Sequence, residues 1–449
     1  MNVCVIGTGY VGLVTGVVFA DLGNDVVCVD RQEDKIAKLN SGVMPIYEPG
    51  LEELAVRNCA EGRLTFTSDL DSAVRTSEIV FLAVGTPPLS DGSTDLRQID
   101  EAARAVAVAL DGYKVIVNKS TVPIGTGERV RGIVEAHAPN DATFDVASNP
   151  EFLREGSAVA DSFNPDRIVI GAPSRKVAMK LLELYAPLER PMIITDVPSA
   201  EMIKYASNAF LATKISFANA IANLCDAAGA DIADVTKGMG HDHRIGPAFL
   251  NAGIGFGGSC FPKDTSSLIR TAERYGVNLD LLTAVVETNQ RQPILFVDRI
   301  EAALGGLTGK TIAVLGLAFK GNTDDLRDSK AIDVIRLLLD RGAYVKAYDP
   351  VAMDNARRVL PGIAYCENAY AAASGADALA VVTEWNEFKL LNFERISSLL
   401  TTKIVFDGRN LYDPDRLESH GLVSYGVGRS SHMIPTNSLA VGRVEVAHS

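Results

Sequence analysis

The first thirty residues constrain the fold most, because an apolar run, a glycine-rich turn and a helical pattern follow one another there. Residues 3–6 are apolar and lead into Gly-Thr-Gly-Tyr-Val-Gly at 7–12, after which residues 13–22 have helical character. A second apolar run over 26–29 ends in Asp30. This order of strand, glycine turn, helix and strand with a terminal acid predicts a βαβ unit that binds a dinucleotide.

Each glycine of the turn has a separate physical role. Gly7 makes the tight turn, Gly9 lets the backbone reach the pyrophosphate, and Gly12 permits close packing of the helix. The helix N-terminus faces the anion. Asp30 is expected to accept hydrogen bonds from the adenosine ribose and to repel a 2′-phosphate, which favours NAD over NADP; Arg31 softens this preference without reversing it.

Further apolar runs predict a parallel sheet that ends near residue 197. Polar residues follow several of these runs, including Thr86, Thr121 and the segment 151–155. Ligands of such sheets lie beyond the carboxyl ends of the strands, so these residues are positioned for a site. The alternative is that Thr-Pro and Asn-Pro pairs here are only turn formers. The predicted strands are 79–84, 115–117, 144–147, 168–170 and 192–194.

A long helix is predicted over residues 199–228, with Gly229 as its stop. Lys204 and Asn208 are four residues apart and therefore share one face, although polar residues on a helix usually just meet solvent. A helix of this length between two α/β units is also suited to hold a dimer together. Helical patterns resume at 265–275 and 279–303, and Gly305-Gly306 is a candidate domain boundary.

The chain contains an incomplete internal repeat. Residues 312–316 and 344–349 repeat the two strands of the first βαβ unit, but the second copy lacks two of the glycines and carries about ten extra residues. We therefore expect that this copy does not cradle a dinucleotide and instead offers Lys320 and Arg327 to an anionic ligand. A solvated charged loop is the alternative. Runs at 378–382 and 404–406 continue the sheet, Arg409 follows the second run, and the tail past Gly428 is expected to be mobile.

Cys260 lies in a glycine-rich turn, with Lys263 and Asp264 close behind it. Glycines at 255, 257 and 258 would let a ligand approach, Lys263 would favour the thiolate, and Pro262 would keep a helix out of the turn. The alternative is a small core side chain. No second cysteine stands at metal-binding spacing, so no metal is expected. His241 and His243 would suit a Cys-His hydrolase, a class that has no use for the nucleotide fold.

The 449 residues predict two to three domains, placed at 1–197, 198–305 and 306–449. A net charge of −13 argues against a nucleic-acid partner. Six scattered cysteines fit a reducing compartment. The first strand starts too early for a signal peptide, and no apolar run reaches the length of a membrane span, so a cytoplasmic protein without a membrane partner is expected.

Taken together, these motifs resemble the nucleotide-sugar dehydrogenases of the UDP-glucose/GDP-mannose dehydrogenase family. The match covers nearly the whole chain: GTGYVG at 7–12, GTP at 85–87, STVPIGT at 120–126, NPEFLREG at 149–156, RIG at 244–246, GFGGSCFPKD at 255–264, FK at 319–320 and FDGR at 406–409. The resemblance implies two Rossmann-like α/β domains joined by a long central helix. It also implies a homodimer or larger homo-oligomer.

The activity implied by the resemblance is the four-electron oxidation of UDP-glucose to UDP-glucuronate at C6 with two NAD. Cys260 would capture the aldehyde as a thiohemiacetal and then carry a thioester. A base acting through Thr121 and Glu151 would take the first proton, and Asp264 would assist the water that hydrolyses the thioester. Lys204 and Asn208 would stabilise the negative oxygen intermediates.

The same resemblance implies the binding residues. Those expected to contact NAD are Gly7, Gly9, Tyr10, Val11, Gly12, Asp30, Lys35, Thr86, Thr121, Glu155, Lys263 and Arg327. Those expected to contact the UDP-sugar are Glu151, Phe152, Leu153, Arg154, Glu155, Lys204, Asn208, Arg244, Phe249, Leu250, Asn251, Ala252, Gly253, Gly257, Lys320 and Arg409. Asn251 replaces a lysine of some relatives. GDP-mannose or UDP-N-acetylmannosamine is the alternative substrate, and a two-electron dehydrogenase or an NAD-sensing regulator is the alternative function.

Overall fold

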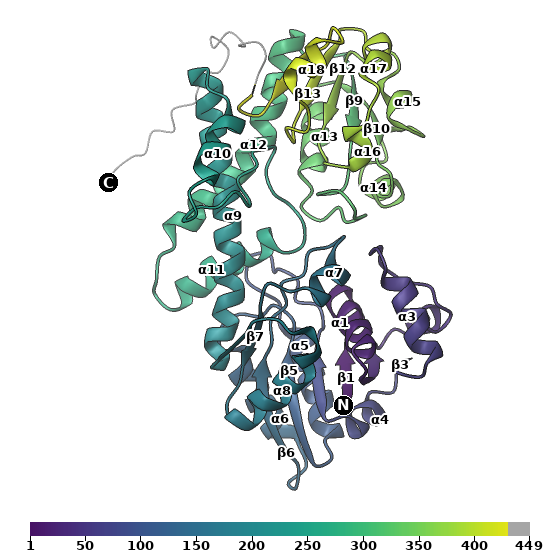
Figure 1. The fold of residues 1–449 in the computed structure, drawn as a ribbon, viewed down its shortest axis with the longest axis vertical. Coiled ribbons are helices and arrows are strands. Elements are labelled where there is room, and N and C mark those ends of the chain that lie inside the picture. The colour runs from purple at the N-terminus through teal and green to yellow at the C-terminus, as the bar shows by residue number, and fades with distance from the viewer. Residues whose placement is uncertain (430–449) are drawn as a thin grey trace. The chain divides into compact units, whose positions relative to one another are not determined.

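In the computed structural model, which describes residues 1–429, the chain forms two compact units that each contain a parallel sheet (Figure 1). Helix α9 (Val197–Ala228), drawn in teal, begins in the first unit and ends in the second. The first unit comprises Met1–Phe210 with Lys263–Leu279, and the second comprises Leu211–Pro262 with the chain from Asp280 onward.

The sheet of the first unit is built from β1 (Asn2–Ile6), β2 (Asp25–Val29), β3 (Leu64–Thr67), β4 (Ile79–Leu82), β5 (Tyr113–Asn118), β6 (Thr143–Ser148), β7 (Ile168–Gly171) and β8 (Met192–Thr195). Their order is β3-β2-β1-β4-β5-β6-β7-β8. Strands β1 to β6 pair in parallel, whereas β7 pairs antiparallel with β6, and β8 runs parallel to β7. The predicted doubly wound sheet is confirmed for β1 to β6, but β7 and β8, which were expected to be parallel to the others, run the other way.

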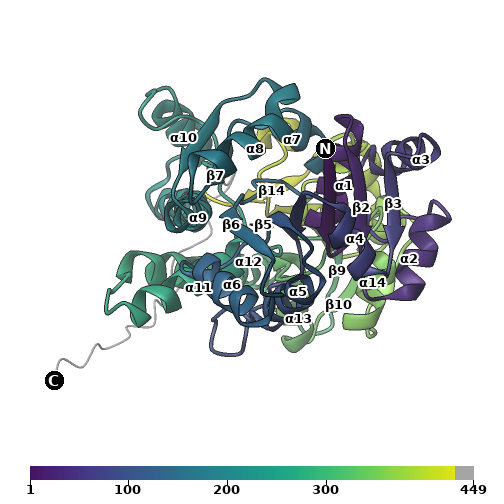
Figure 2. The same cartoon turned by 90° about the horizontal axis from the view of Figure 1, so that it is seen from below.

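Helices cover both faces of this sheet, which explains its continuous apolar strands. In β1, Val3 and Val5 join one buried cluster with α1 (Tyr10–Asp21), while Cys4 and Ile6 join another with α5 (Arg97–Ala109). Figure 2 shows β2 and β3 side by side, with α2 and α3 near β3. The other helices are α2 (Glu33–Asn40), α3 (Leu51–Ala60), α4 (Leu70–Thr76), α6 (Thr126–His137), α7 (Ala158–Phe163), α8 (Arg175–Tyr185) and a 3₁₀ turn at Ala186–Leu188.

The central helices follow the sequence pattern with one difference. Helix α9 ends before Gly229, which adopts the left-handed φ of 76° that commonly terminates a helix. Helix α11 (Phe261–Arg274) starts four residues earlier than expected, because Pro262 falls in its first turn, where a missing N–H breaks no helical bond. Helices α10 (Ile232–Gly240) and α12 (Asp280–Leu304) flank it along the chain. Through residue 429, no helix is long and apolar enough to cross a bilayer.

The second unit repeats the topology of the first. Its strands are β9 (Thr311–Leu315), β10 (Tyr344–Tyr348), β11 (Ala364–Tyr365), β12 (Ala378–Val381), β13 (Ile404–Asp407) and β14 (Val423–Gly426). They pair in parallel in the order β11-β10-β9-β12-β13-β14, which matches the first six strands of the other sheet. The predicted internal repeat is therefore confirmed at the level of topology. The mobile tail expected past Gly428 falls largely on residues 430–449, which lie outside the described residues.

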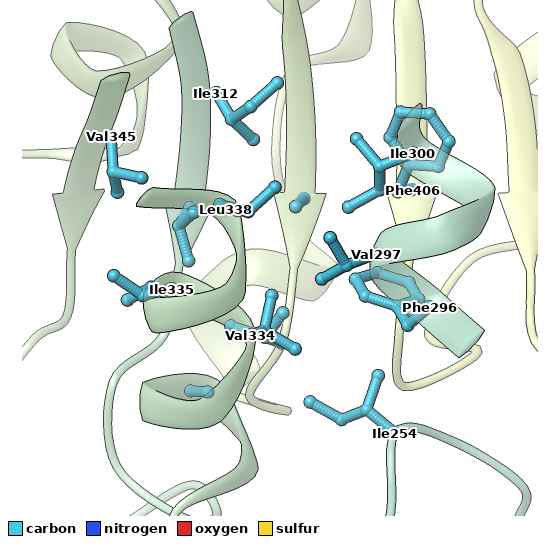
Figure 3. Close-up of a cluster of buried hydrophobic side chains, with 14 of the residues drawn as sticks. Ile254, Phe296, Val297, Ile300, Ile312, Val334, Ile335, Leu338, Val345 and Phe406 are labelled. Atoms are coloured by element: carbon cyan, nitrogen blue, oxygen red, sulfur yellow. The ribbon is translucent and has the colours of Figure 1, made fainter. Parts of the chain in front are cut away.

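One of the two large buried clusters of the second unit lies between its sheet and two helices (Figure 3), and the other includes Leu315, Phe388 and Ile396. Val297 and Ile300 of α12 and Leu338 of α13 (Lys330–Asp340) are fully buried in a cluster with Ile312 of β9 and Phe406 of β13. The remaining helices are α14 (Met353–Val359), α15 (Ala369–Ala373), α16 (Asn386–Lys389), α17 (Phe393–Leu399) and α18 (Pro414–Glu418).

Candidate active site

The turn between β1 and α1 has the geometry of an anion cradle. Gly7 adopts a φ of 97°, and a Cβ there would lie 2.7 Å from the carbonyl oxygen of Ala83. A Cβ on Gly12 would lie 1.9 Å from the carbonyl oxygen of Gly7, so helix and turn touch at this point. Gly9 is the N-cap of α1, forms no side-chain cap and faces open space. The first N–H groups of α1 are thus available to a pyrophosphate, as a dinucleotide requires.

Asp30 follows β2 and lies beside this turn. Its Oδ2 accepts hydrogen bonds from the N–H and hydroxyl of Thr8, at 3.1 and 2.7 Å, and from Lys35 Nζ at 2.9 Å. Burial raises the pKa of Asp30, but the bonds from Thr8 and Lys35 outweigh it and lower the pKa to about 2. Oδ1 accepts the N–H of Gln32 at 3.1 Å. A carboxylate oxygen takes more than one donor, so Oδ1 retains capacity for a ribose hydroxyl.

The Asp30→Asn variant is expected to raise the KM for NAD about tenfold, because a hydrogen bond to a charged acceptor becomes a neutral one. The preference for NAD over NADP should also fall, since the charge that repels a 2′-phosphate is gone. Steady-state kinetics with both cofactors measure the two effects. Asp25→Asn, at an exposed position on the same strand, is the matched control. An unchanged cofactor preference would remove Asp30 from the cofactor site.

The corresponding acid of the second unit, Asp349, is arranged differently. It is fully buried and accepts hydrogen bonds from the N–H groups of Leu317, Ala318, Val351 and Ala352 and from Trp385 Nε1. In the second unit, the hydrogen-bonding capacity of this acid is therefore used by N–H groups of the protein itself. This supports the inference that the second copy does not bind a dinucleotide in the manner of the first.

Helix α9 presents two adjacent buried polar pairs. Lys204 Nζ lies 3.1 Å from Glu151 Oε1, and the exposed fractions of the two side chains are 4% and 5%. One helical turn later, Asn208 Nδ2 donates to Asp264 Oδ2 at 2.6 Å, and Lys263 Nζ lies 2.7 Å from Asp264 Oδ1. Four of the predicted catalytic residues therefore form two neighbouring pairs. The ammonium of Lys263, expected near the thiol, is engaged by Asp264.

Glu151 is held as a carboxylate although it is buried. Burial raises its pKa, but the charge of Lys204 and the N–H of Leu153, which donates at 2.6 Å, bring the net shift below the ordinary value. The neighbouring Phe152 ring lies under Lys204 Nζ at 5.3 Å and under the Arg167 guanidinium at 3.6 Å. The segment 151–155 therefore carries an ionised base candidate in a cationic setting.

The loop after β5 is tied to both β4 and α9. The hydroxyl of Thr86, which follows β4, donates to the carbonyl oxygen of Thr121 at 3.0 Å, so the structure brings these two predicted residues together. Glu201 of α9 accepts the N–H groups of Gly125 and Gly127, each at 2.7 Å. Burial raises the pKa of Glu201 to about 7. Sequence reasoning missed Glu201, which is spaced three residues before Lys204 on the same helix.

A second missed residue is Lys119, the first residue after β5. It is 7% exposed, and its Nζ donates to Asn149 Oδ1 at 3.0 Å and to Tyr185 Oη at 3.1 Å. Burial lowers the pKa of Lys119 to about 8, partly offset by the charge of Glu151. The only signal in the sequence was a lysine directly after an apolar strand run, which does not by itself indicate burial.

In the second unit, the turn before Cys260 is packed against the loop that follows β9. A Cβ on Gly257 would lie 2.2 Å from the carbonyl oxygen of Asp328, and one on Gly258 would lie 2.6 Å from the Phe319 ring. Gly258 N donates to the carbonyl oxygen of Arg327 at 2.9 Å. The absence of a side chain at these two glycines is thus required by the close approach of the loop after β9, and the expected approach of a ligand to the turn stays a prediction.

Two polar side chains fix the same turn. Asn289 of α12 accepts from Phe256 N at 2.7 Å and donates to Phe256 O at 2.9 Å. Arg409, after β13, donates to the carbonyl oxygens of Gly255 at 2.9 Å and Phe319 at 3.3 Å. Arg409, which was predicted to contact the substrate, therefore links the cysteine turn to the loop after β9 through these hydrogen bonds.

Cys260 is half-buried, and its Sγ lies 3.5 Å from Ser259 Oγ. Cys4 and Cys28 are fully buried instead, and burial raises the pKa of the Cys4 thiol to about 12 and that of Cys28 further. No disulfide joins the six cysteines, all of which are among the described residues. Cys4 and Cys28 are therefore unsuited to thiolate chemistry, whereas the half-buried Cys260 remains a candidate.

The other predicted residues take varied positions. Phe249 has a φ of 64°, a conformation rare for a bulky residue and found at functional sites, and Asn219 of α9 holds Gly253 N at 2.8 Å. Lys320 Nζ lies 5.5 Å from the centre of the Phe319 ring. Ion pairs engage the remaining arginines: Arg154 with Asp161, Arg244 with Asp242, and Arg327 with Asp325.

Comparison with known proteins identifies the family. Models of the UDP-glucose/GDP-mannose dehydrogenase family match in order: the NAD binding domain over residues 1–189, the central domain over 198–291 and the UDP binding domain over 313–414. The chain belongs to the UDP-glucose/GDP-mannose dehydrogenase family. It is an NAD-dependent oxidoreductase, and the cradle at Gly7–Gly12 lies in its NAD-binding domain.

Individual relatives of this dehydrogenase are similar over nearly its whole length. UDP-glucose 6-dehydrogenase TuaD of Bacillus subtilis is 50% identical, over 95% of this chain and 93% of the relative. A UDP-glucose 6-dehydrogenase of Rhizobium meliloti is 49% identical, over 96% and 100%. The structure of a UDP-glucose dehydrogenase from Pyrobaculum islandicum matches with a TM-score of 0.87 and 45% identity, covering 91% of this chain and 94% of that one.

Proposed function

We propose that this enzyme oxidises UDP-glucose at C6 to UDP-glucuronate in two two-electron steps. The observation that carries the proposal is the 50% identity, over 95% of the chain, to a protein named UDP-glucose 6-dehydrogenase. The alternative substrate UDP-N-acetylmannosamine has weaker support, because a UDP-D-ManNAc dehydrogenase of Pyrococcus horikoshii is 30% identical. GDP-mannose is the other alternative.

NAD, when bound, supplies the hydride acceptor, and two NAD would be consumed per sugar because two hydrides leave C6. The pyrophosphate is assigned to the N–H groups after Gly9 and the ribose to Asp30, with Lys35 orienting that carboxylate. The further residues proposed to hold NAD are Gly7, Tyr10, Val11, Gly12, Thr86, Thr121, Glu155, Lys263 and Arg327.

The catalytic roles are assigned from the chemistry of each side chain. Glu151, acting with Thr121, takes the C6 hydroxyl proton in the first step. Cys260 Sγ then adds to C6 of the aldehyde as a thiohemiacetal, and the second oxidation leaves a thioester. Covalent capture holds the reactive aldehyde on the enzyme between the two steps.

Lys204 and Asn208 are proposed to donate to the oxygen of C6 whenever it becomes negative. Their fixed pairing with Glu151 and Asp264 supports this role, because donors that are already aligned need little reorganisation. Asp264 assists the water that cleaves the C–S bond, which releases the carboxylate and restores the thiol.

The UDP-sugar is assigned mainly to the segment 151–155, the loop 249–253 and the cations of the second unit. The corresponding domains are an NAD-binding domain at 1–197, a central region at 198–305 and a UDP-sugar-binding domain from 306. The residues proposed to contact the substrate are Glu151, Phe152, Leu153, Arg154, Glu155, Lys204, Asn208, Arg244, Phe249, Leu250, Asn251, Ala252, Gly253, Gly257, Lys320 and Arg409. The cytoplasm is the proposed location, in keeping with the free thiols.

A homodimer held together by α9 is proposed from the surface of that helix. Phe210, Phe217 and Leu224 are 65%, 48% and 62% exposed, and their seven-residue spacing places them on one side of the helix. Solvent-exposed apolar residues in one stripe favour association with a partner. Arg244 could then reach the site of the other subunit.

Replacing both Phe217 and Leu224 by glutamate is expected to convert the dimer to a monomer, with at least about a hundredfold loss of dimer affinity, because two charges would be buried without partners. Light scattering after size exclusion measures the mass. Val108→Glu, at an isolated exposed position on α5, is the control and should leave the mass unchanged. A wild-type monomer, or a double variant that still dimerises, contradicts the assignment to α9.

The count of NADH formed per sugar tests the proposed function. Two NADH per UDP-glucose, together with UDP-glucuronate as the product, are expected. One NADH per sugar would identify a two-electron dehydrogenase, and none with any nucleotide sugar would identify a regulator. A panel of UDP-glucose, UDP-galactose, UDP-N-acetylmannosamine and GDP-mannose identifies the substrate by its kcat/KM.

A further inference from the structure

The buried Lys119 has no carboxylate among the groups that its Nζ touches. Its described hydrogen-bond partners are the amide oxygen of Asn149 and the hydroxyl of Tyr185, both neutral. Asn149 is itself fixed, since its Nδ2 donates to the carbonyl oxygen of Val169 at 2.8 Å. A buried ammonium with only neutral partners is costly, and lysine is almost never fully buried unless it is paired.

The charges that act on Lys119 are those of the Lys204–Glu151 pair. Glu151 attracts the Lys119 ammonium and Lys204 repels it, while Tyr185 stays neutral because burial raises its pKa. In turn, Glu151 is stabilised as a carboxylate by both lysines and by the N–H of Leu153. Lys119 is hydrogen-bonded to Asn149, which lies two residues before Glu151, and Lys204 pairs with Glu151 directly, so both lysines are held near this buried carboxylate.

The two lysines differ in what they can do during the reaction. Lys204 is assigned to the oxygen of C6, so its charge is shared with the substrate when that oxygen becomes negative. Lys119 is anchored by Asn149 and Tyr185 and cannot follow the substrate. As long as Lys119 is protonated, its charge therefore stays near Glu151 while the charge of Lys204 is shared with the substrate.

We propose that the charge of Lys119 keeps Glu151 ionised during turnover, which makes Lys119 a positioning residue for the reaction proposed above. The inference rests on the proposed function, because Glu151 is the base of that reaction. A base must be ionised before it can accept a proton, and a buried carboxylate that loses a neighbouring cation becomes easier to protonate.

The Lys119→Gln variant isolates this charge, since glutamine retains N–H donors for Asn149 but is neutral. The acidic limb of the pH profile of kcat is expected to move up by about one pH unit, which lowers kcat about tenfold at a pH below that limb. A purely structural role would lower kcat at every pH and leave the limb in place.

Lys119→Arg is the complementary variant, because it keeps the charge that Lys119→Gln removes: arginine stays charged at all assay pH values. Its acidic limb is expected to coincide with that of the wild type. Above pH 8, where the wild-type lysine loses its proton, the persistent charge of arginine should repel Lys204 and move the alkaline limb down. Tyr185→Phe removes a hydroxyl and no charge, and its acidic limb should stay in place.

Stability provides a readout that does not depend on activity. The pKa of Lys119 is about 8 in the folded chain, below the ordinary lysine value, so unfolding takes up a proton between these two values. The penalty of the buried charge is complete below pH 8 and is relieved as the pH rises. The Tm of the wild type should therefore rise relative to the Tm of Lys119→Gln as the pH increases from 7.5 to about 9.5.

The outcomes separate the inference from the function. If wild-type enzyme forms no NADH from UDP-glucose, the proposed function fails, while the Tm comparison still tests the buried charge. If the wild type is active but Lys119→Gln leaves the acidic limb within about 0.2 unit, the inference is wrong. A Tm difference that is constant with pH also overturns it. Should Lys119→Gln not fold, an Arg variant whose acidic limb moves upward would contradict the role assigned to the charge.

Discussion

The Cys260→Ser variant is expected to lose at least about a thousandfold in kcat for UDP-glucuronate formation, because the hydroxyl is a far weaker nucleophile than the thiolate. NAD and UDP-glucose should bind within a few-fold of the wild type, since the substitution changes one atom in a turn fixed by Asn289 and Arg409. Stopped-flow NADH formation and titration of both ligands measure the two quantities.

The control for this variant is Cys366→Ser. Cys366 is also half-buried and lies in the same unit, but burial raises the pKa of its thiol and no catalytic role is assigned to it. Its kcat should remain close to that of the wild type. A Cys260→Ser enzyme that still forms two NADH per sugar at the wild-type rate would exclude a thioester.

Lys204→Ala is expected to lower kcat by about a hundredfold to a thousandfold, which is the cost of removing one aligned oxyanion donor, about 2.7–4 kcal/mol. The KM values should change only a few-fold, because the interaction is made chiefly in the transition state. The variant also leaves Glu151 buried without its ion pair, so a lower Tm is expected.

Lys214→Ala on the same helix is the control, since that lysine donates only to the backbone oxygen of Ile245 in the contacts described for it. It should retain nearly full kcat. A Lys204→Ala enzyme with an unchanged kcat and a large rise in the KM for UDP-glucose would show that Lys204 anchors the substrate and does not act on the chemistry.

Local pattern was sufficient to predict the first cofactor turn. Gly12 is required by its contact with Gly7 in the same turn, and Gly7 adopts a left-handed φ of 97°, so the spacing of the motif indicates both. The long helix ending before Gly229 and the repeated strands at 312–316 and 344–349 were predictable for the same reason.

Features that depend on distant segments were not predictable. The crowding of Gly257 and Gly258 comes from Phe319 and Asp328, which are about sixty to seventy residues away in the sequence. From the sequence alone these glycines were assigned to ligand approach, and their packing against the loop after β9 was not foreseen. No local signal distinguishes the two explanations.

The missed acidic and basic residues have the same origin. Lys119 and Glu201 owe their environments to Tyr185 and to the loop at Gly125–Gly127, which the fold brings together from separate elements. Strand direction was also hidden, because β7 carries the same apolar pattern as its parallel neighbours yet pairs antiparallel with β6. The site residues, by contrast, came from motifs, and their chemical roles remain predictions.

The most direct measurement is the mass of the peptide that contains Cys260, taken from wild-type enzyme quenched in acid during turnover of UDP-glucose with NAD. Acid preserves a thioester, so the account predicts a peptide heavier by a UDP-glucuronyl group on Cys260, at a level that falls once substrate is exhausted. Turnover that yields two NADH per sugar while the Cys260 peptide stays unmodified, or carries the group on another residue, would contradict it.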